Sequence, residues 1–153
     1  MISISEILEA SHVNLTLVAN DQAAAVEEVL TKLNGDPRIT DFAALRKAVF
    51  DRNAPALEAG SCGICIAHGR TNAVHGLVMA AGRSPEGFTS PQIAQKVRLV
   101  FVAGIPSAFD SEYLRIVGTI ARLCRDKTMI DKLLHVADPG RFVELLASAE
   151  TKL

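Results

Sequence analysis

The sequence predicts an α/β fold of three layers, in which helices cover both faces of one central β-sheet. Apolar residues recur at helical spacing in the first and last thirds of the chain, whereas the middle third consists of short apolar runs bounded by Gly, Pro and Ser. An order of helices, strands and helices packs best around one sheet. The 153 residues are 49% hydrophobic, which is enough for a buried core. No repeat or linker interrupts the pattern, so we expect a single domain over residues 1–153.

The first third of the chain predicts a short helix, a strand and two longer helices. Residues 3–10 are compatible with a short helix, and residues 13–18 alternate apolar and polar side chains as a strand does. Asn20 is the expected N-cap of a helix that ends at Gly35. Residues 42–51 carry apolar side chains at helical spacing and predict the next helix.

The middle third predicts three strands, over residues 63–66, 76–82 and 96–104. The run 77–81 is apolar throughout, which indicates a strand that is covered on both faces. We therefore expect this third of the chain to form the central sheet.

The last third predicts three helices. Residues 110–125 place apolar side chains on one face, and a second helix begins near Lys127. Asp138 followed by Pro139 is typical of an N-cap with proline at the first helical position, so a closing helix starts there.

Composition and charge exclude several classes of function. The net charge is -1 without a basic stretch, so nucleic-acid binding has little electrostatic support. The apolar runs are shorter than a membrane span, and residues 1–10 lack the features of a signal peptide. Three cysteines are an odd number and do not suggest a disulfide framework. We expect a cytoplasmic protein without direct membrane insertion.

His68 is the leading candidate for chemistry, because it ends a predicted strand and is followed by Gly69 and Arg70. A neutral imidazole is a nucleophile toward phosphorus, and a nearby guanidinium can hold phosphate oxygens. The residues permit a phosphocarrier histidine, but a structural histidine at the end of a strand fits the same pattern.

Cys62, Cys65 and His68 allow a second interpretation, because their spacing could supply three metal ligands or a redox-active Cys-x-x-Cys pair. A fourth ligand is not evident, and redox pairs of this kind start a helix rather than a strand. Period-two alternation would place the two cysteines on opposite faces of the sheet. We favour small buried side chains and expect no metal and no cofactor.

Several separated segments resemble one protein family, the fructose/mannitol-type enzyme IIA domains of the bacterial phosphoenolpyruvate-dependent sugar phosphotransferase system, and most of all its nitrogen-regulatory members. The family's hallmark is a strand similar to G-[IV]-A-[IV]-P-H-G-R, which corresponds to residues 63–70 here. Further similar segments follow in the same order along nearly the whole chain: Val49 to Arg52, Gly82-Arg83 with Glu86-Gly87, Val97 to Phe101, and the closing helices from Leu114 to Leu146.

The resemblance implies a mixed β-sheet of about five strands and a phosphorylated histidine at His68. It further implies that Tyr113 occupies the position of a second active-site histidine, and that Arg52, Ser61, Arg70 and Arg83 support the phosphate. The implied donor is HPr or its nitrogen-branch counterpart. The implied receiver is an enzyme IIB domain or a regulatory target, in sugar transport or nitrogen regulation.

The chain departs from the family pattern at three places. Ala67 replaces the usual proline before the histidine, and Tyr113 can donate a hydrogen bond but cannot become a cation. In the segment 57–62, Glu58 or Ser61 falls where the family has a hydroxyl. Besides the competent phosphocarrier, these departures leave a regulatory protein-binding domain of the same fold, with weak or lost phosphotransfer, as an alternative. The third hypothesis is the cysteine–histidine metal or redox module.

Overall fold

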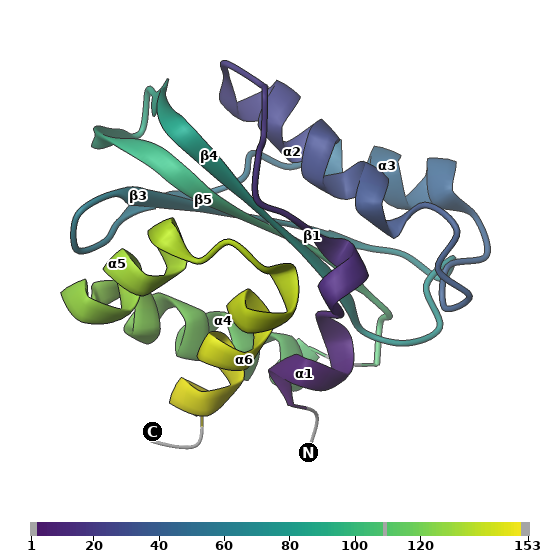
Figure 1. Ribbon diagram of the computed structural model, residues 1–153. Helices are drawn as coiled ribbons and strands as arrows, with labels where there is room; N and C mark the ends of the chain where they lie inside the picture. Colours follow the sequence, from purple (N-terminus) through teal and green to yellow (C-terminus); the bar gives the residue numbers. More distant parts are fainter. Residues whose placement is uncertain (1–2, 109, 151–153) are drawn as a thin grey trace.

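The computed structural model describes residues 3–108 and 110–150 (Figure 1). The helices and strands follow one another in this order: α1 (Ile4–Ile7), the 3-10 turn η1 (Ala10–His12), β1 (Val13–Asn14), α2 (Gln22–Leu30), the 3-10 turn η2 (Thr31–Leu33), α3 (Phe42–Phe50), β2 (Ala56–Glu58), β3 (Gly63–Arg70), β4 (Val78–Ser90), β5 (Ile93–Ile105), α4 (Asp110–Arg125), α5 (Lys127–His135) and α6 (Pro139–Glu150). None of the described helices is long and apolar enough to cross a bilayer.

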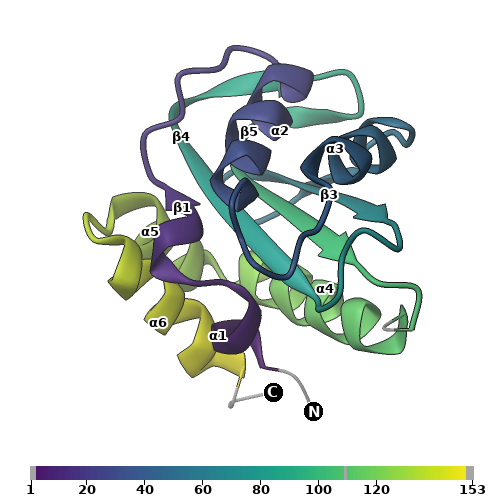
Figure 2. The ribbon, with the colours of Figure 1, turned by 90° about the vertical axis from the view of Figure 1, so that its right-hand side faces the viewer.

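The sheet has five strands in the order β1-β4-β5-β3-β2. The β1–β4 and β3–β5 pairs are parallel, whereas the β4–β5 and β2–β3 pairs are antiparallel, so the sheet is mixed. Figure 2 shows α2 and α3 on one face and α1, α4, α5 and α6 on the other. The expected three-layer α/β fold is therefore confirmed.

Each face of the sheet has its own apolar core, because side chains alternate along every strand. On one face, Ile64 and Ile66 of β3 pack with the buried sides of α4, α5 and α6. On the other, Cys65 and Ala67 of β3 pack with α2 and α3. Successive residues of β3 thus point into different layers, and this alternation sets the direction of His68.

The strand predicted over residues 13–18 is much shorter in the structure. Only Val13 and Asn14 pair with β4. Beyond them, the Glu28 carboxylate accepts hydrogen bonds from the amides of Val18 and Ala19, so these groups are not available to a strand. Leu15 is buried with the α4 side of the sheet, whereas Leu17 is buried with the α2 side. The alternating pattern was therefore a sign of burial in both layers rather than of a long strand.

Further differences concern the ends of predicted elements and one strand that the sequence did not indicate. Asp21, not Asn20, caps α2, because its carboxylate accepts from the amide of Ala24 at 2.8 Å. Strand β4 continues to Ser90 rather than ending at Gly82, β5 begins at Ile93 rather than at Lys96, and the two strands meet in a tight hairpin. The edge strand β2 was not predicted at all.

Candidate functional site

His68 lies near the end of β3, on the face that α4 covers. On one side it is level with Ala103 of β5. On the other side, β2 pairs with β3 only as far as Cys65, after which the Ile66 amide donates to the carbonyl of Pro55. Within the part of the chain that the structure describes, the edge of β3 beside His68 therefore has no neighbouring strand, and the imidazole is half-buried rather than enclosed.

Both ring nitrogens of His68 have a partner. Arg52 Nη1 lies 3.0 Å from Nε2, and the Tyr113 hydroxyl lies 3.0 Å from Nδ1. The rings of His68 and Tyr113 are tilted by 46°, with centroids 4.8 Å apart. Arg52 follows α3, and Tyr113 belongs to the first turn of α4. Two helices from opposite faces of the sheet thus converge on one imidazole.

The chemistry of these partners assigns the proton on the ring. A guanidinium can only donate, so Nε2 must carry the lone pair and accept from Arg52. Nδ1 then carries the hydrogen and donates it to the Tyr113 oxygen. Burial, together with the positive charges of Arg52 and Arg70, lowers the pKa of His68 below its ordinary value. Near neutral pH the imidazole is therefore uncharged, with its nucleophilic lone pair on Nε2.

Tyr113 is a buried side chain, 7% exposed, in the core between α4 and the sheet. Burial raises the pKa of its hydroxyl above the ordinary value, while Arg52 opposes this shift. The hydroxyl consequently stays protonated and uncharged at neutral pH.

The structure brings four of the six predicted site residues together, and separates the other two. Arg70 lies two positions after His68 on the same face of β3, and its charge acts on the imidazole. Ser61 precedes β3, so the length of the strand, roughly 3.3 Å for each residue, separates it from His68. Glu58 pairs with Gly63 at that distant end, and therefore no carboxylate from the segment 57–62 faces the imidazole.

Arg83 has a different setting from the one that the resemblance implies. Its guanidinium donates to three backbone carbonyls, those of Leu15 at 3.2 Å, Leu133 at 3.1 Å and Val136 at 2.6 Å. It pairs with Leu99, whereas Met79 is the β4 residue level with Ala103 and so with His68. Arg83 thus ties β4 to the segment after β1 and to the end of α5, several positions away from the imidazole.

The two cysteines near His68 do not form a joint site with it. Cys62 belongs to the core under α4, while Cys65 belongs to the core under α3, on the other face of the sheet. Burial raises the pKa of Cys65 to about 12 and also raises that of Cys62. Cysteines on opposite faces cannot hold one metal ion with His68 or form a disulfide with each other across the sheet.

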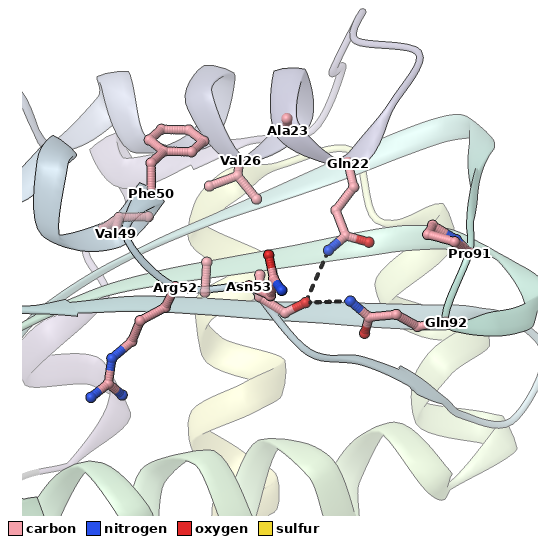
Figure 3. A pocket seen from close by; sticks show the side chains of 11 residues that line it. Gln22, Ala23, Val26, Val49, Phe50, Arg52, Asn53, Pro91 and Gln92 are labelled. Carbon is pink, nitrogen blue, oxygen red and sulfur yellow. Dashed lines mark hydrogen bonds between the residues drawn. The ribbon is translucent and has the colours of Figure 1, made fainter.

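A cavity of about 280 Å³ lies behind the phosphoacceptor candidate, between α2, α3 and the β4–β5 turn. Figure 3 shows Arg52 extending away from the cavity walls formed by Val26 and Phe50. The amides of Gln22 and Gln92 both donate to the Ala54 carbonyl, at 3.0 and 2.9 Å. These bonds fix the backbone close to Arg52, whose exposed side chain reaches His68 Nε2.

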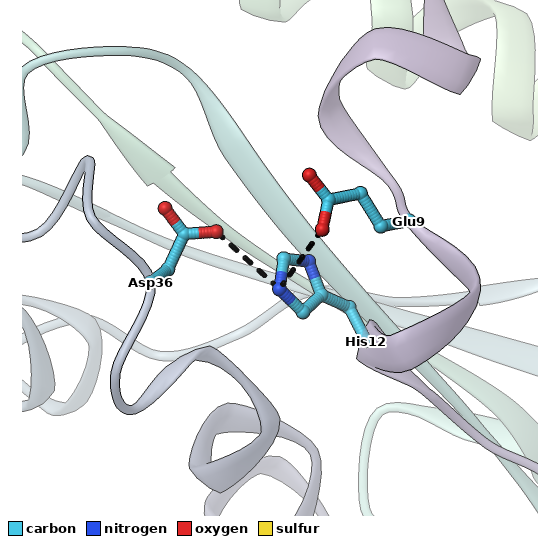
Figure 4. Close-up of side chains that lie close together, drawn as sticks. All are labelled: Glu9, His12 and Asp36. Atoms are coloured by element: carbon cyan, nitrogen blue, oxygen red, sulfur yellow. Dashed lines mark ion pairs between the residues drawn. The ribbon is translucent and has the colours of Figure 1, made fainter.

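A second histidine cluster lies beside β1, away from His68, and was not predicted. Figure 4 shows His12 between Glu9 and Asp36, whose carboxylate oxygens lie 3.9 and 3.3 Å from Nε2. The three ligand atoms are within 4.8 Å of one another, as a metal site would need. However, Arg38 already pairs with Asp36 at 2.8 Å and lies 3.6 Å from Glu9. Its guanidinium therefore already neutralises these carboxylates. We assign the cluster a structural role in joining η1 to the segment after η2.

Comparison with known proteins agrees with the sequence resemblance. Residues 6–149 match the family described as "Phosphoenolpyruvate-dependent sugar phosphotransferase system, EIIA 2". The "PTS system fructose-specific EIIA component" of Haloferax volcanii is 27% identical over 124 residues, which are 80% of each chain. The "PTS system fructose-specific EIIABC component" of Bacillus subtilis is 21% identical over 144 residues, and the match spans only 23% of its length.

Solved structures share the fold. The nitrogen regulatory protein IIA-Ntr of Neisseria meningitidis superposes with a TM-score of 0.80 at 25% identity, covering 94% of this chain and 98% of that chain. The IIA mannitol of Escherichia coli superposes with a TM-score of 0.72 at 20% identity, covering 90% and 97%. A complex of Escherichia coli enzyme IIAMTL with phosphorylated enzyme IIBMTL gives a TM-score of 0.73 at 19% identity, covering 93% and 99%. The last two likenesses concern the fold alone.

Proposed function

This chain belongs to the EIIA 2 family of the phosphoenolpyruvate-dependent sugar phosphotransferase system, and we propose that it is a phosphocarrier that accepts a phosphoryl group on Nε2 of His68. The observation that carries this proposal is the pairing of Nε2 with Arg52, 3.0 Å away at the open edge of β3. Nε2 bears the lone pair there, and a cation that can bind phosphoryl oxygens is already beside it.

The proposed reaction is an in-line transfer between two histidines. The Nε2 lone pair attacks phosphorus, the P–N bond of the donor phosphohistidine breaks, and its electron pair returns to the donor imidazole. Arg52 exchanges its hydrogen bond to Nε2 for bonds to the phosphoryl oxygens, while Arg70 adds positive charge. Such transfer needs positioning and charge neutralisation, and both arginines lie close enough to His68 to lower its pKa.

We propose HPr or its nitrogen-branch counterpart as the donor. Family membership supports an enzyme IIB domain as the receiver. Two exposed apolar side chains adjacent in sequence to site residues support protein docking: Leu114, which follows Tyr113, is 67% exposed, and Phe50, two positions before Arg52, is 38% exposed. The likeness to a nitrogen regulatory protein supports a second candidate, in which a regulatory target reads the phosphorylation state of His68.

Phosphorylation in solution tests the proposal. We expect incubation with phosphoenolpyruvate, enzyme I and HPr to add one acid-labile phosphoryl group to the intact protein. His68→Ala should abolish this gain, while His75→Ala should retain it, because the His75 backbone amide donates to the Arg38 carbonyl, in the segment before α3. No mass gain with several HPr homologues, or an equal gain in His68→Ala, would rule out the phosphocarrier.

A further inference from the structure

We propose that Tyr113 is a positioning residue that holds the Nδ1–H form of His68, and that it leaves the site with a single ionisation, that of His68 itself. This inference deepens the proposed function and rests on it for its relevance to phosphotransfer. The state of the imidazole can nevertheless be measured in the unphosphorylated protein.

The guanidinium of Arg52 favours one of the two arrangements of hydrogens between Arg52, His68 and Tyr113. If Tyr113 donated to Nδ1, the ring hydrogen would sit on Nε2 and face the Arg52 N–H across 3.0 Å. Two donors would then oppose each other, and the lone pair would point away from the open edge. With Tyr113 as the acceptor, both 3.0 Å contacts are hydrogen bonds, and the Nε2 lone pair becomes available when Arg52 moves to the phosphoryl oxygens.

Packing, rather than a further hydrogen bond, fixes the Tyr113 hydroxyl. The side chain is 7% exposed, and His68 Nδ1 is the one hydrogen-bond partner of its hydroxyl among the described residues. Since α4 and β3 share a core, the ring cannot move away from the imidazole without opening that core. The hydroxyl is therefore a rigid acceptor placed against Nδ1.

Arg52 and Arg70 are the charged groups that act on the pKa of His68. Arg52 from the segment after α3 and Arg70 on β3 are guanidinium groups, which stay protonated. On α4, Glu112 pairs with Arg115 at 3.6 Å, and Tyr113 stays uncharged because burial raises its pKa. A histidine at position 113 would instead titrate in the same range as His68 and couple to it.

Nitrogen-15 NMR of the unphosphorylated protein tests the inference. We expect wild-type His68 to show the Nδ1–H form and to titrate as one site. Tyr113→Phe, which removes only the hydroxyl, should lower the population of the Nδ1–H form although Arg52 remains beside Nε2, and Tyr113→His should change the curve to two coupled steps. Ser111→Ala, an exposed substitution two positions earlier on α4, should leave the wild-type curve unchanged.

Phosphotransfer provides a second measurement. We expect Tyr113→Phe to slow phosphoryl acceptance from phospho-HPr by about tenfold, the effect of one hydrogen bond, and to place part of the phosphoryl group on Nδ1. An unchanged ring form in Tyr113→Phe, or a two-step titration of wild-type His68, would overturn the inference. If no variant or wild type accepts phosphate but the NMR results hold, the proposed function fails while the role of Tyr113 stands.

Discussion

Arg52 Nη1 lies 3.0 Å from His68 Nε2, so a cation covers the nucleophilic lone pair in the resting protein. The positive charge of Arg52 lowers the pKa of His68 and so disfavours protonation of the imidazole. The same guanidinium can bind the oxygens of a phosphoryl group on Nε2. It joins the end of α3 to the end of β3, two elements that meet only in the folded chain.

Replacing Arg52 with glutamine should change the titration and the reactivity of His68 together. Burial is the largest cause of the lowered His68 pKa and Arg52 the next, so Arg52→Gln should raise that pKa toward, but not above, 6.5. The lost guanidinium should slow phosphoryl acceptance by about a hundredfold. Arg46→Gln, which affects an exposed pair with Glu27, is the matched control. An unchanged His68 titration curve in Arg52→Gln would be inconsistent with the observed contact.

Arg83→Gln should lower stability without slowing phosphoryl acceptance. Its guanidinium serves three carbonyls on two separate segments, so we expect the free energy of unfolding to fall by about 2 kcal/mol. Urea denaturation and the phospho-HPr assay measure the two effects separately. A large loss of the rate of phosphoryl acceptance with unchanged stability would show that Arg83 acts in phosphate binding instead.

Gly69 permits the close approach of α3 to β3. A Cβ atom there would lie 2.7 Å from the backbone nitrogen of Val49, so Gly69→Ala should cost about 1–3 kcal/mol of unfolding free energy. Gly118→Ala is the contrasting variant, since its Cβ would meet only Arg122 Nη1 at 3.5 Å within α4. It should stabilise the protein by about 0.5–1 kcal/mol. Thermal unfolding of both variants measures these changes. Equal changes in stability for the two variants would contradict the close packing of α3 on β3 at Gly69.

The Asp36 carboxylate should make the protein sensitive to acid. Its pairing with Arg38 lowers the pKa of Asp36 below the ordinary 3.8. The stabilisation is complete above pH 3.8 and is lost as the pH falls through the lowered folded-state pKa. Asp36→Asn should cost about 1–3 kcal/mol at pH 7, and the difference from wild type should shrink below pH 3.8. Glu144→Gln, in an exposed pair, should show little difference at either pH. A constant difference across the range would exclude this linkage.

Much of the fold was predictable because local signals agree with the final packing. The helix α4 has the predicted bounds, since its apolar face and its polar face are clearly separated. The strands β4 and β5 were underestimated because the far half of their hairpin is polar and partly exposed, so it carries no apolar run. The edge strand β2 is short and exposed at Leu57 and Glu58, and its sequence gives no alternation to detect.

The site was predictable only in part. His68 was suggested by its place at a strand end, and Tyr113 by resemblance to the family. The carbonyl partners of Arg83 lie on segments distant in sequence, so no local pattern reveals that its guanidinium is already engaged. The approach of Arg52 to Nε2 depends on α3 packing across β3 and is a property of the tertiary structure.

The most direct test is to identify the ring nitrogen of His68 that carries the phosphoryl group. We expect phosphorus–nitrogen NMR of the protein phosphorylated by HPr to show the phosphoryl group on Nε2 of His68, with Nδ1 still bearing its hydrogen toward Tyr113. Phosphate on Nδ1 of wild-type His68, or on another residue, would contradict it.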